Sequence, residues 1–111
     1  MVSIGEARSY ALSLGGAEEK AHFEKASFRV RNKIFMTLDE KDGRACLKLS
    51  LIDQDVFHVM NKEVIYAVPN KWGLQGWTFV ELRDIGRDLF EEAVSSAHKE
   101  LLISGRSKRE K

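Results

Sequence analysis

The chain is organised around an alternating stretch that runs, from residue 28 to residue 49, FRVRNKIFMTLDEKDGRACLKL. Apolar and polar residues alternate in three segments, Phe28–Arg31, Lys33–Leu38 and Arg44–Leu49, and this period of two is typical of β-strands. Between them, Asn32 tolerates a left-handed turn conformation, and Asp42-Gly43 is a strong hairpin signal. The stretch therefore predicts an antiparallel meander of three strands.

The same alternation sorts the side chains onto two faces, because successive residues of a strand point in opposite directions. The face predicted to join the core carries Phe28, Val30, Ile34, Met36, Leu38, Ala45, Leu47 and Leu49. The opposite face carries Arg29, Arg31, Lys33, Phe35, Thr37, Arg44, Cys46 and Lys48. This second face contains five basic residues, one aromatic residue and no acidic residue, which makes it the most suggestive functional feature of the pattern.

A helix is predicted before the meander, over residues 3–14. Ser3 and Glu6 have the spacing of a capping box, and Gly15-Gly16 supplies a stop. The polar, acidic residues 17–20 are expected to form a connecting loop.

After the meander, Asp53 is predicted to cap a short helix with Val56, Phe57, Val59 and Met60 buried. Two short strands follow, at residues 64–68 and 77–82. Asp84 is expected to cap a last helix that ends before Gly105.

The two short strands are joined by the most unusual part of the chain. Residues 68–82 hold the only proline, Pro69, and both tryptophans, Trp72 and Trp77. Two glycines, Gly73 and Gly76, lie between the tryptophans, so the segment from residue 69 to 76 is predicted to be a shaped loop.

The predicted order is α-β-β-β-α-β-β-α. This order indicates an α+β fold, with an antiparallel sheet of about five strands and the terminal helices packed on one face. We expect one domain over residues 1–104 and a flexible basic tail over residues 105–111.

Composition places the chain among ordinary globular proteins. It has 111 residues, 43% hydrophobic and 32% charged, and a formal net charge of +1. Bulk charge therefore recruits neither nucleic acid nor membrane, and any such binding depends on local patterning. The single cysteine, Cys46, and the absence of a signal-peptide pattern or long apolar run predict a cytoplasmic protein.

The residues Val68–Gly73 and Gly76–Val80 resemble the MmcQ/YjbR family of small bacterial proteins. Leu14–Glu19, the Phe28–Leu38 hairpin and Leu47–Leu49 support the resemblance, which spans about residues 3–103. It implies a CyaY (frataxin-type) fold and DNA binding through a "double wing" motif.

This sequence departs from the family pattern in the same loop. Many members have Met-Asn-Lys followed by His-Trp. Here Pro69 takes the methionine position, Asn70-Lys71 is kept, and Trp72 follows without the histidine. The four residues from Gly73 to Gly76 are an addition before the second tryptophan, so no role of that histidine is carried over.

Two interpretations of these features stay open. The basic face is either a solvated sheet surface or a surface on which arginines grip phosphates and Phe35 stacks on a base. Asn70, Lys71 and Trp72 either stabilise the loop or form a wing that contacts nucleic acid.

The leading hypothesis is a monomeric, non-enzymatic protein that binds the DNA backbone weakly. Its candidate residues are Arg29, Arg31, Lys33, Arg44, Lys48, Asn70, Lys71 and Trp72. The alternatives are a protein–protein interaction domain without nucleic acid, and a ligand or enzyme site beneath the Trp72 loop.

No cofactor or metal is predicted. The three histidines, His22, His58 and His98, lack ligand spacing, and one cysteine cannot complete a structural zinc site. Glu6, Glu18 and Glu19 are too few for the iron site of frataxin-type proteins, and the acids of residues 39–42 lack calcium-loop spacing. Phosphate-loop, dinucleotide and hydrolase motifs are absent from the sequence.

Overall fold

The computed structural model describes residues 1–110, with side chains described for residues 1–103. Its elements are α1 (Ile4–Ser13), β1 (Glu18–His22), β2 (Lys25–Val30), β3 (Lys33–Asp39), β4 (Arg44–Lys48), α2 (Leu51–Met60), β5 (Ile65–Ala67), the 3-10 helix η1 (Gly73–Gln75), β6 (Trp77–Glu81) and α3 (Arg87–Glu110). The α+β class is confirmed, with one strand more than the sequence indicates.

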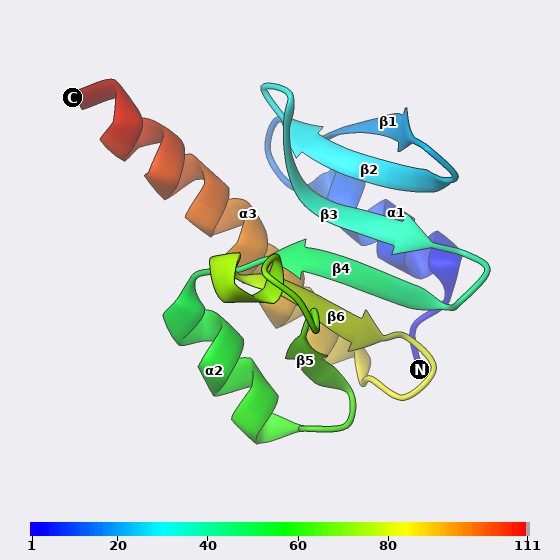
Figure 1. Ribbon diagram of the computed structural model, residues 1–111. Helices are drawn as coiled ribbons and strands as arrows, with labels where there is room; N and C mark the ends of the chain where they lie inside the picture. Colours follow the sequence, from blue (N-terminus) through cyan, green and yellow to red (C-terminus); the bar gives the residue numbers. More distant parts are fainter. Residues whose placement is uncertain (111) are drawn as a thin grey trace.

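All neighbouring strands are antiparallel, and their order across the sheet is β1-β2-β3-β4-β6-β5. Helices α1 and α3 lie behind the sheet in Figure 1, and α2 lies beside the β5 edge. The predicted segregation of the terminal helices is confirmed. The other sheet face, turned to the viewer, is covered by no α-helix of the described chain, and the short η1 turn lies in front of it near β4 and β6. We call it the outer face.

The core lies between the sheet and helices α1 and α3. Phe28, Met36 and Leu47 contribute fully buried side chains from the inner face of the sheet. Ala7 and Ala11 of α1 and Phe90, Val94 and Ala97 of α3 close the core from the helical side. The predicted capping box is present, since the Glu6 amide donates to Ser3 Oγ and the Ser3 amide donates to Glu6 Oε1.

Residues 17–20 were expected to form a connecting loop, and for residues 18–20 this expectation is wrong, because they belong to strand β1. Glu18 to His22 pair with β2 from Arg29 to Lys25, and the strand forms one edge of the sheet. Its residues are exposed or half-buried, so no apolar alternation marks it in the sequence. Phe23 closes the β1–β2 turn with a left-handed φ of 59°.

A β-bulge reverses two side chains relative to the predicted alternation. Phe28 pairs with Met36, whereas Arg29 pairs with Ile34, so the register passes over Phe35. Phe35 is therefore fully buried, with its ring 5.4 Å from the His98 ring of α3 in an edge-to-face contact. Ile34 takes the place on the outer face, and the predicted role of Phe35 as an exposed stacking plane is wrong.

Helix α2 differs from its predicted start and its predicted buried side. Its cap is Ser50, whose Oγ accepts the Asp53 amide, so the helix begins at Leu51 rather than after Asp53. Of the four residues expected to be buried, Phe57 is buried, while Val56, Val59 and Met60 are exposed. The helix lies at the sheet edge and therefore covers less of the core than its apolar content indicates.

Helix α3 begins and ends later than predicted. It starts at Arg87, because Asp84 belongs to a turn in which its amide donates to the Glu81 carbonyl. It continues past Gly105 to Glu110. The side chains of the predicted basic tail, residues 105–111, lie outside the described residues.

Candidate functional site

A groove of about 300 Å³ lies on the outer face of the sheet. Its floor is formed by Ile34, Thr37, Cys46 and Phe79, which come from strands β3, β4 and β6. One wall is formed by His22 and Lys25, next to the β1–β2 turn. The other wall is formed by Val68, Trp72 and Trp77, from the loop before β6 and from its first residue. The loop and the sheet face therefore form one surface.

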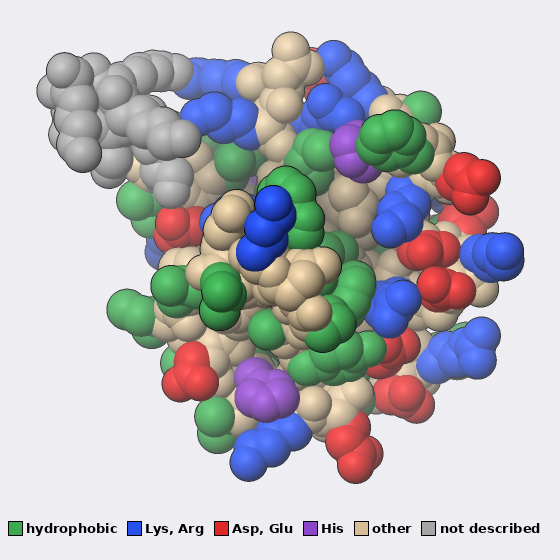
Figure 2. Space-filling model, viewed as in Figure 1, with side chains coloured by type: hydrophobic (Ala, Val, Ile, Leu, Met, Phe, Trp, Pro, Cys, Tyr) green, Lys and Arg blue, Asp and Glu red, His purple; other side chains and the backbone are tan. Residues whose placement is uncertain are grey.

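Figure 2 shows this side of the molecule. Hydrophobic side chains run over its centre, and Lys and Arg side chains are spread around them. Asp and Glu side chains are also visible, mainly towards the right of the view. The surface is thus mixed in charge, with an apolar middle.

The Trp72 loop, residues 69–76, is held in shape by polar contacts from three sides. Asn70 Oδ1 accepts the Trp72 amide at 2.8 Å, which closes a turn around Lys71. Gln54 of α2 donates through Nε2 to the Gly73 carbonyl at 3.0 Å and to the Trp77 carbonyl at 3.2 Å. The Leu49 amide donates to the Gly76 carbonyl at 3.0 Å. Asn70 is therefore a loop-forming residue, and Trp72 is held at the groove wall with half of its surface exposed.

Both glycines of this loop are required by close backbone approach. A Cβ atom on Gly73 would lie 2.0 Å from the Val68 carbonyl oxygen, and one on Gly76 would lie 1.9 Å from the Leu49 carbonyl oxygen. Gly76 also has a φ of 104°, which side-chain-bearing residues rarely adopt. At Gly73 the loop folds tightly onto its own start at Val68, and at Gly76 it packs tightly on Leu49 after β4, so only glycine fits at either position.

The Arg44 side chain lies on the outer face and is held there by contacts with neighbouring side chains. Its guanidinium lies 4.1 Å from the centre of the Phe79 ring and pairs with Asp42 at 3.2 Å and Glu81 at 3.8 Å. Glu81 also accepts a hydrogen bond from the Tyr66 hydroxyl. The Tyr66 contact raises the pKa of Arg44 above its ordinary value, and burial, followed by the hydrogen bond to Glu81, raises the pKa of Tyr66. Arg44 thus covers one side of Phe79.

The remaining predicted basic residues are divided between the outer face and a turn. Arg29 lies on the outer face and donates to Ser27 Oγ at 2.9 Å. Lys48 lies opposite Trp77, and its ammonium lies next to Gly76. Arg31 lies instead in the β2–β3 connection, with a left-handed φ of 53°, and Lys33 follows that connection as the first residue of β3, where it pairs with Val30.

The expectation of an acid-free outer face is wrong. Opposed residues of neighbouring strands share a face, and Glu18 lies opposite Arg29. Asp39 and Glu81 both lie opposite Arg44, on its two sides. The sequence pattern did not show these acids because two come from strands outside the meander and Asp39 was assigned to a connection.

Among the predicted site residues, Trp72 lines the groove directly. Lys71 lies at its rim, with Nζ 6.0 Å from the centre of the Trp72 ring. The sequence did not single out His22, Lys25 and Phe79 as site residues. Phe79 and Trp77 alternate in a predicted strand, so a face assignment for that strand could have found them, whereas the position of Lys25 depends on the unpredicted β1 pairing.

Cys46 on the groove floor is a protonated thiol at neutral pH. Burial raises its pKa from 9.0 to about 11, although the nearby charge of Lys25 acts in the opposite direction. A thiol with this pKa is a poor nucleophile, because the thiolate is the reactive form. Cys46 therefore contributes to the shape of the groove.

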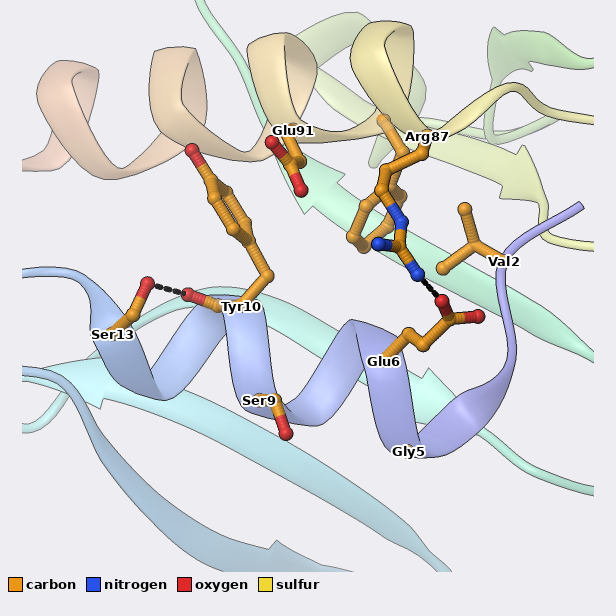
Figure 3. A pocket seen from close by; sticks show the side chains of 9 residues that line it. Val2, Gly5, Glu6, Ser9, Tyr10, Ser13, Arg87 and Glu91 are labelled. Atoms are coloured by element: carbon orange, nitrogen blue, oxygen red, sulfur yellow. Dashed lines mark hydrogen bonds and ion pairs between the residues drawn. The ribbon is translucent and has the colours of Figure 1, made fainter.

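A second hollow of about 420 Å³ lies between α1 and α3. Figure 3 shows Arg87 of α3 reaching across it to Glu6 of α1, with which it forms an ion pair. Tyr10, on the same wall, shares a hydrogen bond with Ser95. These contacts tie the two helices together, and each of these polar groups already has a partner in the fold.

The described residues contain no group of three or more His, Cys, Asp or Glu side chains that could hold a metal ion. Within the same part of the chain, no helix combines the length and the apolar character needed to cross a membrane.

Comparison with known proteins places the fold and the family. No curated protein matches the sequence. The structure is similar to the crystal structure of the Deinococcus radiodurans protein DR2400, which carries the domain name DUF419. The TM-score is 0.75 with 19% sequence identity, over 88% of this chain and 77% of that one, and this likeness shows a shared fold. The family model described as YjbR matches residues 12–100, which is most of the sequence. The chain therefore belongs to the YjbR family.

Proposed function

We propose that this protein binds DNA through the outer-face groove and its rim. The observation that carries the proposal is the joining of the Trp72 loop and the sheet face into one surface with an apolar floor. Lys25, Lys48 and Lys71 surround that floor, and their ammonium groups are suited to contact phosphate oxygens. The resemblance to the MmcQ/YjbR family, which implies DNA binding, agrees with this role.

The basic residues have different roles in this proposal. Lys71 and Lys48 flank the Trp72 loop, and Lys25 lies across the groove from it. Arg44 is already paired with Asp42 and Glu81, so it supports Phe79 more than it contacts a ligand. Arg29, Arg31 and Lys33 extend the surface towards the β2–β3 turn and supply outer phosphate contacts.

We also propose that the protein is not an enzyme and that it is located in the cytoplasm. The support for a non-enzymatic role is the chemistry of the groove. Its one thiol, Cys46, is protonated at neutral pH. The outer-face carboxylate of Glu81, two residues after Phe79, is bound by Tyr66 and Arg44.

The first prediction concerns the rim lysines. Changing Lys25, Lys48 and Lys71 together to glutamate is expected to weaken binding of a fluorescent DNA by at least roughly tenfold at low salt. It should also reduce the slope of log affinity against log salt by about two to three, because about one counterion is released per lost phosphate contact. Fluorescence anisotropy titrations at several salt concentrations measure both quantities.

A matched control separates local contacts from net charge. Lys41, Lys62 and Lys99 are exposed lysines away from the groove, and changing them to glutamate alters the net charge by the same amount. This control should retain most of the affinity. Equal losses in the two triple variants, or no loss in the rim variant, would exclude the groove as the DNA-binding surface.

A second candidate function is protein–protein interaction, and the surface of α2 favours it. Leu51, Ile52, Val56, Val59 and Met60 are all more than half exposed on this helix. Asp55, also exposed, is the charged residue among them. An apolar face of this kind commonly marks an interface. The matching partner surface is apolar with a basic side chain opposite Asp55.

The second prediction tests this candidate. Ile52→Ser with Val56→Ser should remove a specific protein partner from a quantitative pull-down and leave the protein folded, since both side chains are exposed. Leu12→Ser is the control, because Leu12 is exposed on α1. Sedimentation of the purified protein tells a second copy from another protein. An unchanged set of captured proteins in the double variant would count against this function.

A further inference from the structure

The floor of the groove has the wrong chemistry for phosphate and the right chemistry for flat apolar rings. Ile34 and Phe79 are apolar, Thr37 is neutral, and Cys46 is held as a thiol by its raised pKa. A phosphate placed directly on these side chains would lose its hydration against neutral groups, which is costly, whereas the ammonium group of Lys25 lies at the wall of the groove. A nucleobase offers a flat face to such a surface and loses little.

Aromatic rings on which a base can stack lie at one wall of the groove and on its floor. Trp72 is 50% exposed at the groove wall, and Trp77 lies beside it at the start of β6. Phe79 is fixed by Arg44 against its ring and by the Tyr66 ring at 5.8 Å. Fixed aromatic rings on neighbouring positions of a sheet are the means by which some nucleic-acid-binding domains stack unpaired bases.

Three lysine side chains lie around the apolar floor of the groove. Lys71 accompanies Trp72, Lys48 borders the loop at Gly76, and Lys25 stands on the opposite wall. A strand whose phosphates follow this rim would turn its bases inward, onto Trp72 and Phe79. A duplex cannot do so, because its bases are already paired and stacked inside and only its phosphates and groove edges face the protein.

We infer that the groove binds a single strand of nucleic acid through its unpaired bases, one of which stacks on Trp72. This inference rests on the proposed function and names its ligand class. The volume of about 300 Å³ lies at the small end of ligand sites, so the groove holds one or two bases. The rest of the strand crosses the rim and contributes phosphate contacts.

The third prediction tests this inference with oligonucleotides of about ten residues, a length within the range of single-strand binding sites. The wild-type protein should bind oligothymidylate at least roughly tenfold more tightly than a duplex of the same length, with quenching of tryptophan fluorescence. An abasic strand of that length should bind as weakly as the duplex. Trp72→Ala should weaken oligothymidylate binding by about 5- to 150-fold, since one base stack is worth about 1–3 kcal/mol.

Leu74→Ala is the matched control, because Leu74 lies in the same loop, is highly exposed and does not line the groove. It should bind oligothymidylate as the wild type does. Equal affinity for the abasic strand and oligothymidylate, or for wild type and Trp72→Ala, would overturn base stacking. If base stacking is overturned but DNA binding still depends on Lys25, Lys48 and Lys71, the proposed function stands without this inference. Failure to bind either the strand or the duplex would overturn both. A parallel titration with oligouridylate identifies whether the sugar matters.

Discussion

Gly76→Ala is expected to destabilise the protein by at least roughly 3 kcal/mol, which combines the strain of a disfavoured backbone conformation with a direct clash. The added Cβ would lie 1.9 Å from the Leu49 carbonyl oxygen and 3.1 Å from its carbonyl carbon. Neither atom can move freely, because the Leu49 amide donates a hydrogen bond to the Gly76 carbonyl and so holds the two residues together. The melting temperature should fall by about 12–24 °C. Thermal unfolding followed by circular dichroism measures this change.

Gly15→Ala provides the control for the general cost of replacing a glycine. A Cβ on Gly15 would meet no atom within 4 Å. This variant should melt within a few degrees of the wild type, or slightly higher, because alanine restricts the unfolded chain. If the melting temperature of Gly76→Ala equalled that of Gly15→Ala, the close packing of the loop on β4 would be disproved.

Phe35→Ala is expected to cost about 3–5 kcal/mol, the usual range for removing a buried phenylalanine. The Phe35 ring is fully buried between β3 and α3, and it contacts the His98 ring edge-to-face. Its removal leaves a cavity that neighbouring side chains fill only in part. Urea unfolding curves for the variant and the wild type give this free-energy difference directly.

The adjacent variant Ile34→Ala is the comparison that tests the β-bulge. Ile34 lies half-exposed on the groove floor, so its loss should cost about 1 kcal/mol and should also weaken ligand binding. Without the bulge, Ile34 would face the core and Phe35 the outer face. Ile34→Ala would then be the more destabilising of the two variants. A larger cost for Ile34→Ala than for Phe35→Ala would therefore contradict the register of β2 and β3.

Much of the fold could be predicted because local signals agree with one another. The capping box of Ser3 and Glu6, the Asn32 and Asp42-Gly43 turns and the apolar stripe of the last helix each specify their own segment. Their order then leaves an antiparallel sheet with segregated helices. Strand β1 could not be predicted, because an exposed edge strand has no apolar side to bury.

The candidate site could be predicted only in part. Trp72, Lys71 and Lys48 were recognisable from composition and pattern, and they lie at one wall of the groove or its rim. Lys25 and His22 reach the opposite wall because β2 pairs with β1, and β1 carries no strand signal in the sequence. The role of Arg44 also changed, since Glu81 and Phe79 come from a strand that pairs with β4.

The sequence by itself determined the class of fold, the family and the presence of a shaped loop over residues 69–76. These features depend on residue types and spacings that are local to each segment. Only the tertiary structure decided that Phe35 is buried and Ile34 lines the groove, and which side of α2 faces solvent. A period of two fixes the alternation within a strand, but a bulge shifts it, and the partner strand determines where that bulge lies. The outer face of this protein therefore acquired its apolar floor from pairing between strands.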